Sequence, residues 1–137
     1  MIDVVAQYRL EIQIEDDIVI VRRKARQLAQ ARKLDPFATA AITTAVSELT
    51  RNVLVHAGGG SVVLEEISDG ERYGVRATFE DHGPGIANLE LALAGGHSTS
   101  KTMGLGLSGS KRLADRFEVK TEKGVGTTVR IEKWQGL

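Results

Sequence analysis

Residues 80–111 read EDHGPGIANLELALAGGHSTSKTMGLGLSGSK and hold seven of the chain's 15 glycines. Glycine loses more backbone freedom on folding than any other residue, so such a cluster indicates unusual backbone angles or close approach to a ligand. Residues 81–85 follow a strand-like run at 73–80, and residues 104–107 open a helix-like run that ends near Arg116. A glycine-rich turn before a helix directs N–H groups and the positive end of the helix dipole at one point, which favours a phosphate.

Two common phosphate motifs do not account for this stretch. Residues 104–109 match G-x-G-x-x-G, but no strand immediately precedes them and no βαβ repeat surrounds them, which disfavours a dinucleotide site. The P-loop pattern requires Lys directly after its last Gly, whereas Ser110 separates Gly109 from Lys111. A surface loop without any ligand remains an alternative.

Length and composition predict one domain over residues 1–137 with a mostly aliphatic core, since 42% of residues are hydrophobic and only 4% are aromatic. Lys plus Arg and Asp plus Glu number 18 each, which argues against a nucleic-acid binder that relies on bulk charge. The absence of cysteine excludes disulfides and thiolate catalysis and fits a reducing cytoplasm. The first residues lack signal-peptide features, and the longest aliphatic run, 18–21, is too short to cross a membrane.

The pattern of apolar residues predicts alternating strands and helices. Alternation predicts a strand over 8–14, and helical spacing predicts a helix from about Asp16 to Leu34. Asp35 and Pro36 are typical of a helix start, and glycines stop that helix after His56. Two hairpins follow this order, with strands at 61–67 and 72–80 and at 117–121 and 127–133. The order predicts an α/β (α+β) two-layer sandwich: a mixed, mostly antiparallel sheet with helices on one face.

Glu48 and Asn52 lie four residues apart on the helix predicted over 36–56, so they share a face. Their oxygens could hold Mg²⁺ together, or Glu48 could accept a proton from a nucleophile while Asn52 holds the metal. Taken alone, the pair also fits a solvated glutamate and an asparagine on the helix surface.

Asp81 ends a predicted strand, where its carboxylate could accept a hydrogen bond from an exocyclic amine such as that of adenine. A turn-forming Asp before glycine is the alternative. Thr127 and Thr128 could supply a hydroxyl near the same base, or could simply favour a strand. The three histidines lack metal-ligand spacing, and His82 and His97, expected to face solvent in loops, receive no role.

These segments resemble the boxes of the GHKL ATPase superfamily in the same order. Residues 48–52, ELTRN, resemble its N-box, residues 81–86, DHGPGI, its first Gly box and residues 104–107, GLGL, its second; GTT at 126–128 also matches. The resemblance covers nearly the whole chain and implies the Bergerat ATPase fold with ATP and Mg²⁺ as cofactors. Within the superfamily, ITTAVSELTRN at 42–52 is similar to the N-box helix of RsbT-like serine/threonine switch kinases of the bacterial stressosome.

The resemblance implies a role for each matched residue. Glu48 would be the general base for the substrate hydroxyl and could reach the metal through a water, and Asn52 would be a Mg²⁺ ligand. Asp81 would read adenine, with Gly85 allowing the base to approach. The other residues implied in nucleotide binding are Gly83, Ile86, Gly104, Leu105, Gly106, Leu107 and Thr127. Lys101 matches no box, and we add the hypothesis that it meets a phosphate because it lies beside Gly104.

The implied activity is a partner-switching protein kinase. It would transfer the ATP γ-phosphate to Ser or Thr of STAS-domain antagonists and then bind and activate the regulatory domain of a PP2C-type phosphatase. The alternative is an anti-sigma factor kinase that sequesters a sigma factor and phosphorylates its STAS partner. Such proteins have a small or polar residue at the position of Arg51 and a His-Ala/Gly step, which His56-Ala57 partly matches. A binding module without catalysis is disfavoured by the presence of Glu48 and Asn52.

Overall fold

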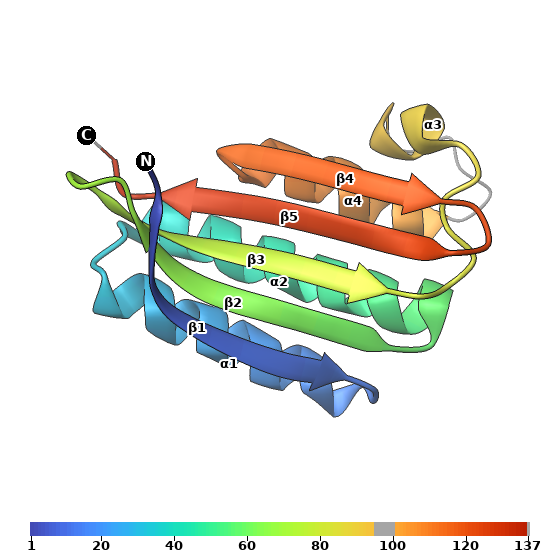
Figure 1. The fold of residues 1–137 in the computed structure, drawn as a ribbon, viewed down its shortest axis with the longest axis horizontal. Helices are drawn as coiled ribbons and strands as arrows, with labels where there is room; N and C mark the ends of the chain where they lie inside the picture. Colours follow the sequence, from blue (N-terminus) through green and yellow to red (C-terminus); the bar gives the residue numbers. More distant parts are fainter. Residues whose placement is uncertain (95–100, 137) are drawn as a thin grey trace.

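The computed structural model describes residues 1–94 and 101–136, with side chains described outside 101–105. Within these residues the chain forms five strands and four helices (Figure 1). The strands are β1 Asp3–Ile12, β2 Gly60–Ser68, β3 Tyr73–Asp81, β4 Arg116–Glu122 and β5 Gly126–Trp134. The helices are α1 Asp16–Ala31, α2 Pro36–Ala57, α3 Leu89–Ala94 and α4 Lys101–Leu113.

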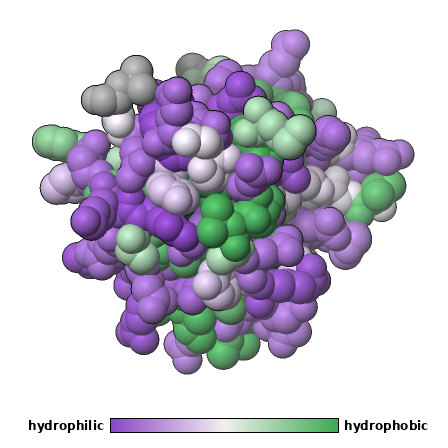
Figure 2. Space-filling view, turned by 60° about the vertical axis from the view of Figure 1, so that its left-hand side comes forward, coloured by the Kyte–Doolittle hydropathy of each residue, from purple (hydrophilic) through white to green (hydrophobic). Residues whose placement is uncertain are grey.

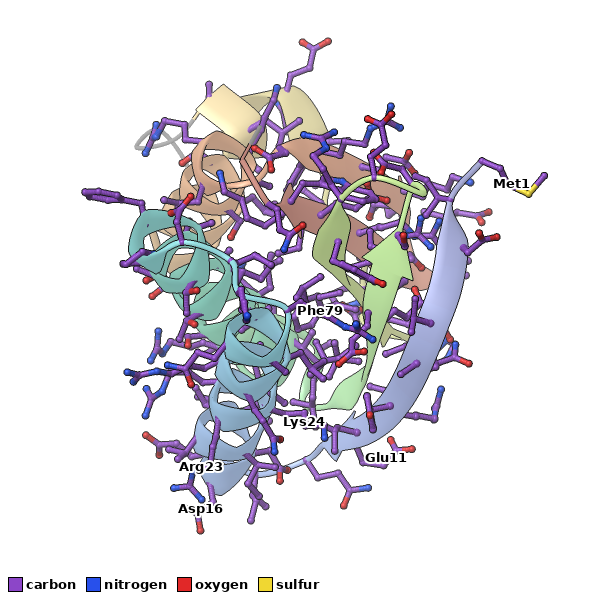
Figure 3. All side chains as sticks on the ribbon, turned by 90° about the vertical axis from the view of Figure 1, so that its left-hand side faces the viewer. Met1, Glu11, Asp16, Arg23, Lys24 and Phe79 are labelled. Atoms are coloured by element: carbon purple, nitrogen blue, oxygen red, sulfur yellow. The ribbon has the colours of Figure 1, made fainter. Side chains whose placement is uncertain are left out.

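The five strands make one sheet in the order β1-β2-β3-β5-β4. All four pairs of neighbouring strands among the described residues are antiparallel. The sequence predicted a mixed sheet that is mostly antiparallel. Helices α1, α2 and α4 lie side by side against one face of the sheet (Figures 1 and 3). The predicted two-layer sandwich with helices on one face is therefore confirmed.

Helix α2 is the central element of the helical layer. Asp35 caps its start, because its Oδ1 accepts the N–H of Ala38 at 2.8 Å, and Pro36 occupies the first turn. The helix ends at Gly58, whose φ of 74° is a left-handed conformation that favours glycine. With 22 residues, α2 is about 33 Å long. Its last two turns lie beside the end of β3 and the start of β5. The apolar stripe packed on the sheet is Ile42, Val46, Leu49 and Val53.

The turn between β1 and α1 differs from the sequence prediction. Asp17 Oδ2 accepts the N–H groups of Gln13 and Ile14 at 2.8 and 3.0 Å, which bends the chain before Ile14 can extend the strand. These two backbone hydrogen bonds also lower the pKa of Asp17. Ile14 is consequently 58% exposed, although its place in the alternating run predicted a core position. Helix α1 likewise ends at Ala31 rather than near 34.

The segment after β3 also departs from the prediction. Helix α3 was not predicted, and it begins where Asn88 Oδ1 accepts the N–H of Leu91 at 3.0 Å. Helix α4 begins at Lys101, so Gly104 lies inside its first turn and does not open it as predicted. A glycine inside a helix costs only about 1 kcal/mol relative to alanine, which the packing of α4 on α2 can offset. Helix α4 ends before Asp115, whose N–H joins the sheet by donating to the Glu132 carbonyl at 2.9 Å.

The other face of the sheet carries a row of charged side chains that are nearly buried. Arg76 Nε lies 2.9 Å from Glu132 Oε2, and Arg76 Nη1 lies 3.5 Å from Glu65 Oε1. Glu65 is only 7% exposed and Glu132 only 4%. Glu65 of β2 and Glu132 of β5 both lie directly opposite Arg76 of β3. Each of the three has a core residue next to it along its strand, so these three side chains point to the other face, because successive side chains alternate between the faces of a sheet. One guanidinium thus compensates two buried carboxylates.

The polarity of the surface and the length of the helices bear on whether the chain could span a membrane. On the side that carries the chain ends, it is mostly hydrophilic with separate hydrophobic patches (Figure 2). None of the helices in the described ranges is long and apolar enough to cross a bilayer.

Candidate functional site

The main candidate site is a cavity between the end of α2, the end of β3, the start of β5 and the start of the Gly-rich segment. Its walls are mostly apolar, and Phe79 lies between the sheet and the helices (Figure 3). The polar side chains that line it are Asn52, His56, Asp81 and Thr127. It therefore has the usual composition of a ligand site, an apolar cavity with a few converging polar groups.

Asn52 is the polar group most deeply buried in this cavity. The residue is only 9% exposed, and neither Nδ2 nor Oδ1 of its side chain has a hydrogen-bond partner among the described residues. Gly106 of α4 lies directly against it, because a Cβ at position 106 would be 2.8 Å from Asn52 Oδ1. A buried amide without a partner costs about 1 to 3 kcal/mol, so its retention here points to a ligand.

Glu48 lies one turn before Asn52 on the same face of α2. Its Oε1 pairs with Nη1 of Arg51 at 3.0 Å, and its side chain is 38% exposed. Glu48 does not line the cavity itself, in contrast to Asn52. Its carboxylate is therefore partly accessible to solvent, one helical turn from the Asn52 that lines the cavity.

Asp81 and His56 also line the cavity. Asp81 Oδ1 accepts the N–H of Gly83 at 2.9 Å, and its Oδ2 has no hydrogen-bond partner among the described residues. Burial lowers the pKa of His56 below its usual value, while the nearby Asp81 carboxylate partly opposes this. Sequence reasoning gave His56 no role, although its spacing of four residues after Asn52 placed it on the same helix face.

Gly85 and Ile86 are held by the turn between β4 and β5. Gly85 has a φ of 79°, and a Cβ there would lie 2.6 Å from the Glu122 carbonyl oxygen. The Pro84 carbonyl accepts the N–H of Gly124 at 2.8 Å. Close approach of this turn explains the need for glycine at 85 without reference to a base. Its predicted role in admitting a base stays a prediction, although Gly85 lines the cavity.

Thr127 lies opposite Asp81 in the pairing of β3 with β5, so the two side chains enter the cavity together. Its hydroxyl lies 2.9 Å from Oγ1 of Thr121, which also accepts the N–H of Ile86 at 2.9 Å. Sequence reasoning missed Thr121, because its role depends on the folding of β4 back onto the Gly-rich loop. Thr128 is the neighbouring residue on β5 and belongs to the other face of the sheet.

The second Gly box is placed only in part. Leu107 lines the cavity and Gly106 contacts Asn52. The side chains at positions 101–105 lie outside the described residues, so the expected nucleotide contacts of Lys101 and Leu105 stay predictions. The backbone of Gly104 lies inside α4, but its expected contact with the nucleotide also stays a prediction. Among the described residues, no three His, Cys, Asp or Glu side chains gather into a metal-binding group. Any metal in this site would consequently depend on few protein ligands.

Comparison with known proteins places the chain in a family. The histidine kinase-like ATPase domain matches residues 13–133. The chain is 38% identical over 125 residues to the serine/threonine-protein kinase RsbT of Bacillus subtilis, which covers 91% of this chain and 94% of that protein. It is 30% identical over 116 residues to an anti-sigma F factor of a Thermoanaerobacter species, which covers 79% of this chain and 80% of the relative.

A solved structure has the same fold. The crystal structure of the RsbU and RsbW domains of a Mycobacterium tuberculosis protein superposes with a TM-score of 0.66 at 18% identity. The match covers 96% of this chain and about a third of that longer one, at 34%. The match of the family over residues 13–133 and the high coverage of the relatives agree with the fold. This chain belongs to the family of histidine kinase-like ATPase domains.

Proposed function

We propose that this protein is an ATP-dependent serine/threonine protein kinase of a bacterial partner-switching pathway. The observation that carries the proposal is the buried amide of Asn52, which has no partner among the described residues, in a cavity that is also lined by Asp81. The extensive similarity to a serine/threonine-protein kinase over nearly its whole length supports the reaction type. Membership of an ATPase family implies ATP as the nucleotide.

The nucleotide would lie along the cavity with its base toward Asp81 and its phosphates toward Asn52. The Asp81 oxygen without a partner suits the exocyclic amine of adenine, since a carboxylate only accepts hydrogen bonds. The apolar walls around it, such as Phe79 and Ile86, suit the faces of a purine ring. Gly106 lets α4 approach Asn52, which would bring the backbone of this helix close to the phosphates.

The residues present fit a bound Mg²⁺. The Asn52 amide oxygen is a hard ligand that has no partner in the part of the chain that the structure describes. Mg²⁺ in phosphate sites typically binds one or two protein oxygens and several waters. The metal would neutralise charge on the phosphates during transfer. Asn52 would therefore hold the metal, and Glu48, partly accessible to solvent, remains available to the protein substrate.

In the proposed reaction the substrate hydroxyl oxygen forms a bond to the γ-phosphorus while the bond from that phosphorus to the ADP oxygen breaks. Glu48 accepts the hydroxyl proton, with its Oε2 free because Arg51 binds Oε1. Such transfer needs mainly positioning and charge neutralisation. The half-exposed position of Glu48 suits a protein substrate that docks at the mouth of the cavity.

A transfer assay tests this proposal. The purified chain is incubated with magnesium, γ-labelled ATP and candidate STAS-domain proteins, and label on Ser or Thr of one of them is the expected result. Glu48→Gln should abolish transfer while retaining ATP binding, and Asn52→Ala should lose both. Glu15→Gln is the matched control, because Glu15 is an exposed acid that makes no side-chain cap. Transfer that persists in Glu48→Gln would overturn the role of Glu48.

A second candidate function is supported by the similarity to anti-sigma F factors. In that case the chain would also sequester a sigma factor. The same preparation, mixed with candidate sigma factors and with the regulatory domain of a PP2C-type phosphatase, distinguishes the two by size-exclusion chromatography. Stable capture of the phosphatase domain supports the switch kinase, and stable capture of a sigma factor supports the anti-sigma factor.

A further inference from the structure

A chain of hydrogen bonds enters the cavity from its outer wall. The N–H of Ile86, in the Gly-rich loop, donates to Oγ1 of Thr121 on β4 at 2.9 Å. Thr121 Oγ1 lies 2.9 Å from Oγ1 of Thr127 on β5, which lines the cavity. Three separate segments are thus connected through two hydroxyl groups, and the last of them reaches the ligand space.

The distances around Thr121 favour one direction for this chain. A threonine hydroxyl has one proton to donate. Thr121 accepts from Ile86, so its own proton is available either for Thr127 at 2.9 Å or for the Gly126 carbonyl at 3.4 Å. The second distance is long for a bond between a hydroxyl and an oxygen, so the geometry favours donation from Thr121 to Thr127. Thr127 then keeps its own proton for the cavity, where it has no acceptor among the described residues.

We propose that Thr121 is a positioning residue that holds the Thr127 hydroxyl as a donor toward the base and thereby makes the site select adenine over guanine. This inference rests on the proposed nucleotide site. Donation from the Ile86 N–H polarises the Thr121 hydroxyl, which strengthens its bond to Thr127. Thr121 itself does not line the cavity and acts only through its neighbour.

The pattern presented to a base follows from the pairing of β3 with β5. Asp81, an acceptor, lies opposite Thr127, the oriented donor, and both line the cavity. Adenine offers the matching pair, an exocyclic amine that donates and a neighbouring ring nitrogen, N1, that accepts. Guanine offers the reverse, an oxygen that accepts and an N1–H that donates. If the Thr127 hydroxyl donated to Thr121 instead, it could no longer donate to N1 of adenine. The site would then lose one of the two contacts that distinguish adenine from guanine.

The test compares nucleotide affinities of Thr121→Val, Thr121→Ser and the unmodified chain. The probes are ATP, GTP and 1-deazaadenosine triphosphate, which lacks the N1 acceptor, each with magnesium in a calorimetric titration. The unmodified chain and Thr121→Ser should bind ATP about tenfold more tightly than the 1-deaza compound, a difference of about 1.4 kcal/mol. Thr121→Val should reduce this ratio below about threefold and should narrow the preference for ATP over GTP.

The ratio separates orientation of the hydroxyl from general damage to the loop. A purely structural effect of Thr121→Val would weaken ATP and the 1-deaza compound equally, and that result, or an unchanged ratio, would overturn the inference. In a chain that already has Thr127→Val, the Thr121→Val change should leave the ratio unaffected, because nothing remains to be oriented. If the unmodified chain does not bind ATP at all, the proposed function fails instead.

Discussion

The side-chain amide of Asn52 lies against the backbone of Gly106, so that α4 packs over a polar group for which the described residues provide no hydrogen-bond partner. A Cβ at position 106 would come within 2.9 Å of Cγ of Asn52 and closer still to both of its terminal atoms. This contact joins the N-box helix to the second Gly box. It explains why a glycine is retained in the interior of a helix, where alanine would be more stable.

We predict that Gly106→Ala weakens binding of ATP and magnesium by at least about tenfold, because the added methyl displaces either the Asn52 amide or α4. Gly109→Ala is the matched control on the same helix, since nothing lies within 4 Å of a Cβ at that position. The control should keep full affinity and gain about 0.5 to 1 kcal/mol of stability. Calorimetric titration and thermal unfolding measure both quantities. Equal affinities of the two variants would contradict a binding role for Asn52.

Replacing Asn52 by leucine should separate stability from function. Leucine has a similar shape but no polar atoms, so the variant avoids the cost of a buried amide without partners. The ligand-free protein should unfold with a free energy equal to that of the unmodified chain or up to about 1 kcal/mol higher. Magnesium-dependent binding of ATP should be lost. If Asn52→Leu clearly destabilised the ligand-free protein, the amide would instead have a structural role.

The positions of the candidate site residues could largely be predicted, because each has a local signal in the sequence. Asp35 and Pro36 mark the start of α2, and helical spacing then places Glu48 and Asn52 on one face. Asp81 follows a clear strand pattern and precedes a glycine. These signals depend on neighbours in the sequence, which is the information that local patterns contain.

The remaining features depend on contacts between distant segments. Thr121 matters because β4 folds back to within 2.9 Å of the Ile86 N–H, 35 positions earlier in the chain. Ile14 fits an alternating pattern but is exposed, because the Asp17 carboxylate turns the chain there. The sequence predicted that α4 begins at Gly104, because glycine disfavours the interior of a helix. In the structure α4 begins at Lys101, and close packing against Asn52 favours a glycine at position 106 inside the helix.

Removing the charge of Arg76 should cost more stability than any surface substitution. Arg76→Met leaves the Glu65 and Glu132 carboxylates buried without a cation, and breaking a buried ion pair in this way typically costs about 3 to 5 kcal/mol. Arg130→Met is the control, since Arg130 is exposed and bonds only Thr78. Its effect should stay within about 0.5 kcal/mol in urea unfolding. Addition of Glu65→Gln and Glu132→Gln to Arg76→Met should recover most of the loss.

The burial of His56 predicts a dependence of stability on pH. Its pKa in the folded protein is lowered below 6.5 chiefly by burial, so below pH 6.5 the unfolded chain binds more protons than the folded one. The contribution of His56 to the free energy of unfolding should therefore be complete above pH 6.5. It should decrease as the pH falls from 6.5 toward the lower pKa of the folded protein. His56→Gln should remove this part of the pH dependence, measured by urea unfolding between pH 5 and 8. His82→Gln should not, because the side chain of His82 is 82% exposed. Parallel pH profiles for His56→Gln and the unmodified chain would show that protonation of His56 is not linked to folding.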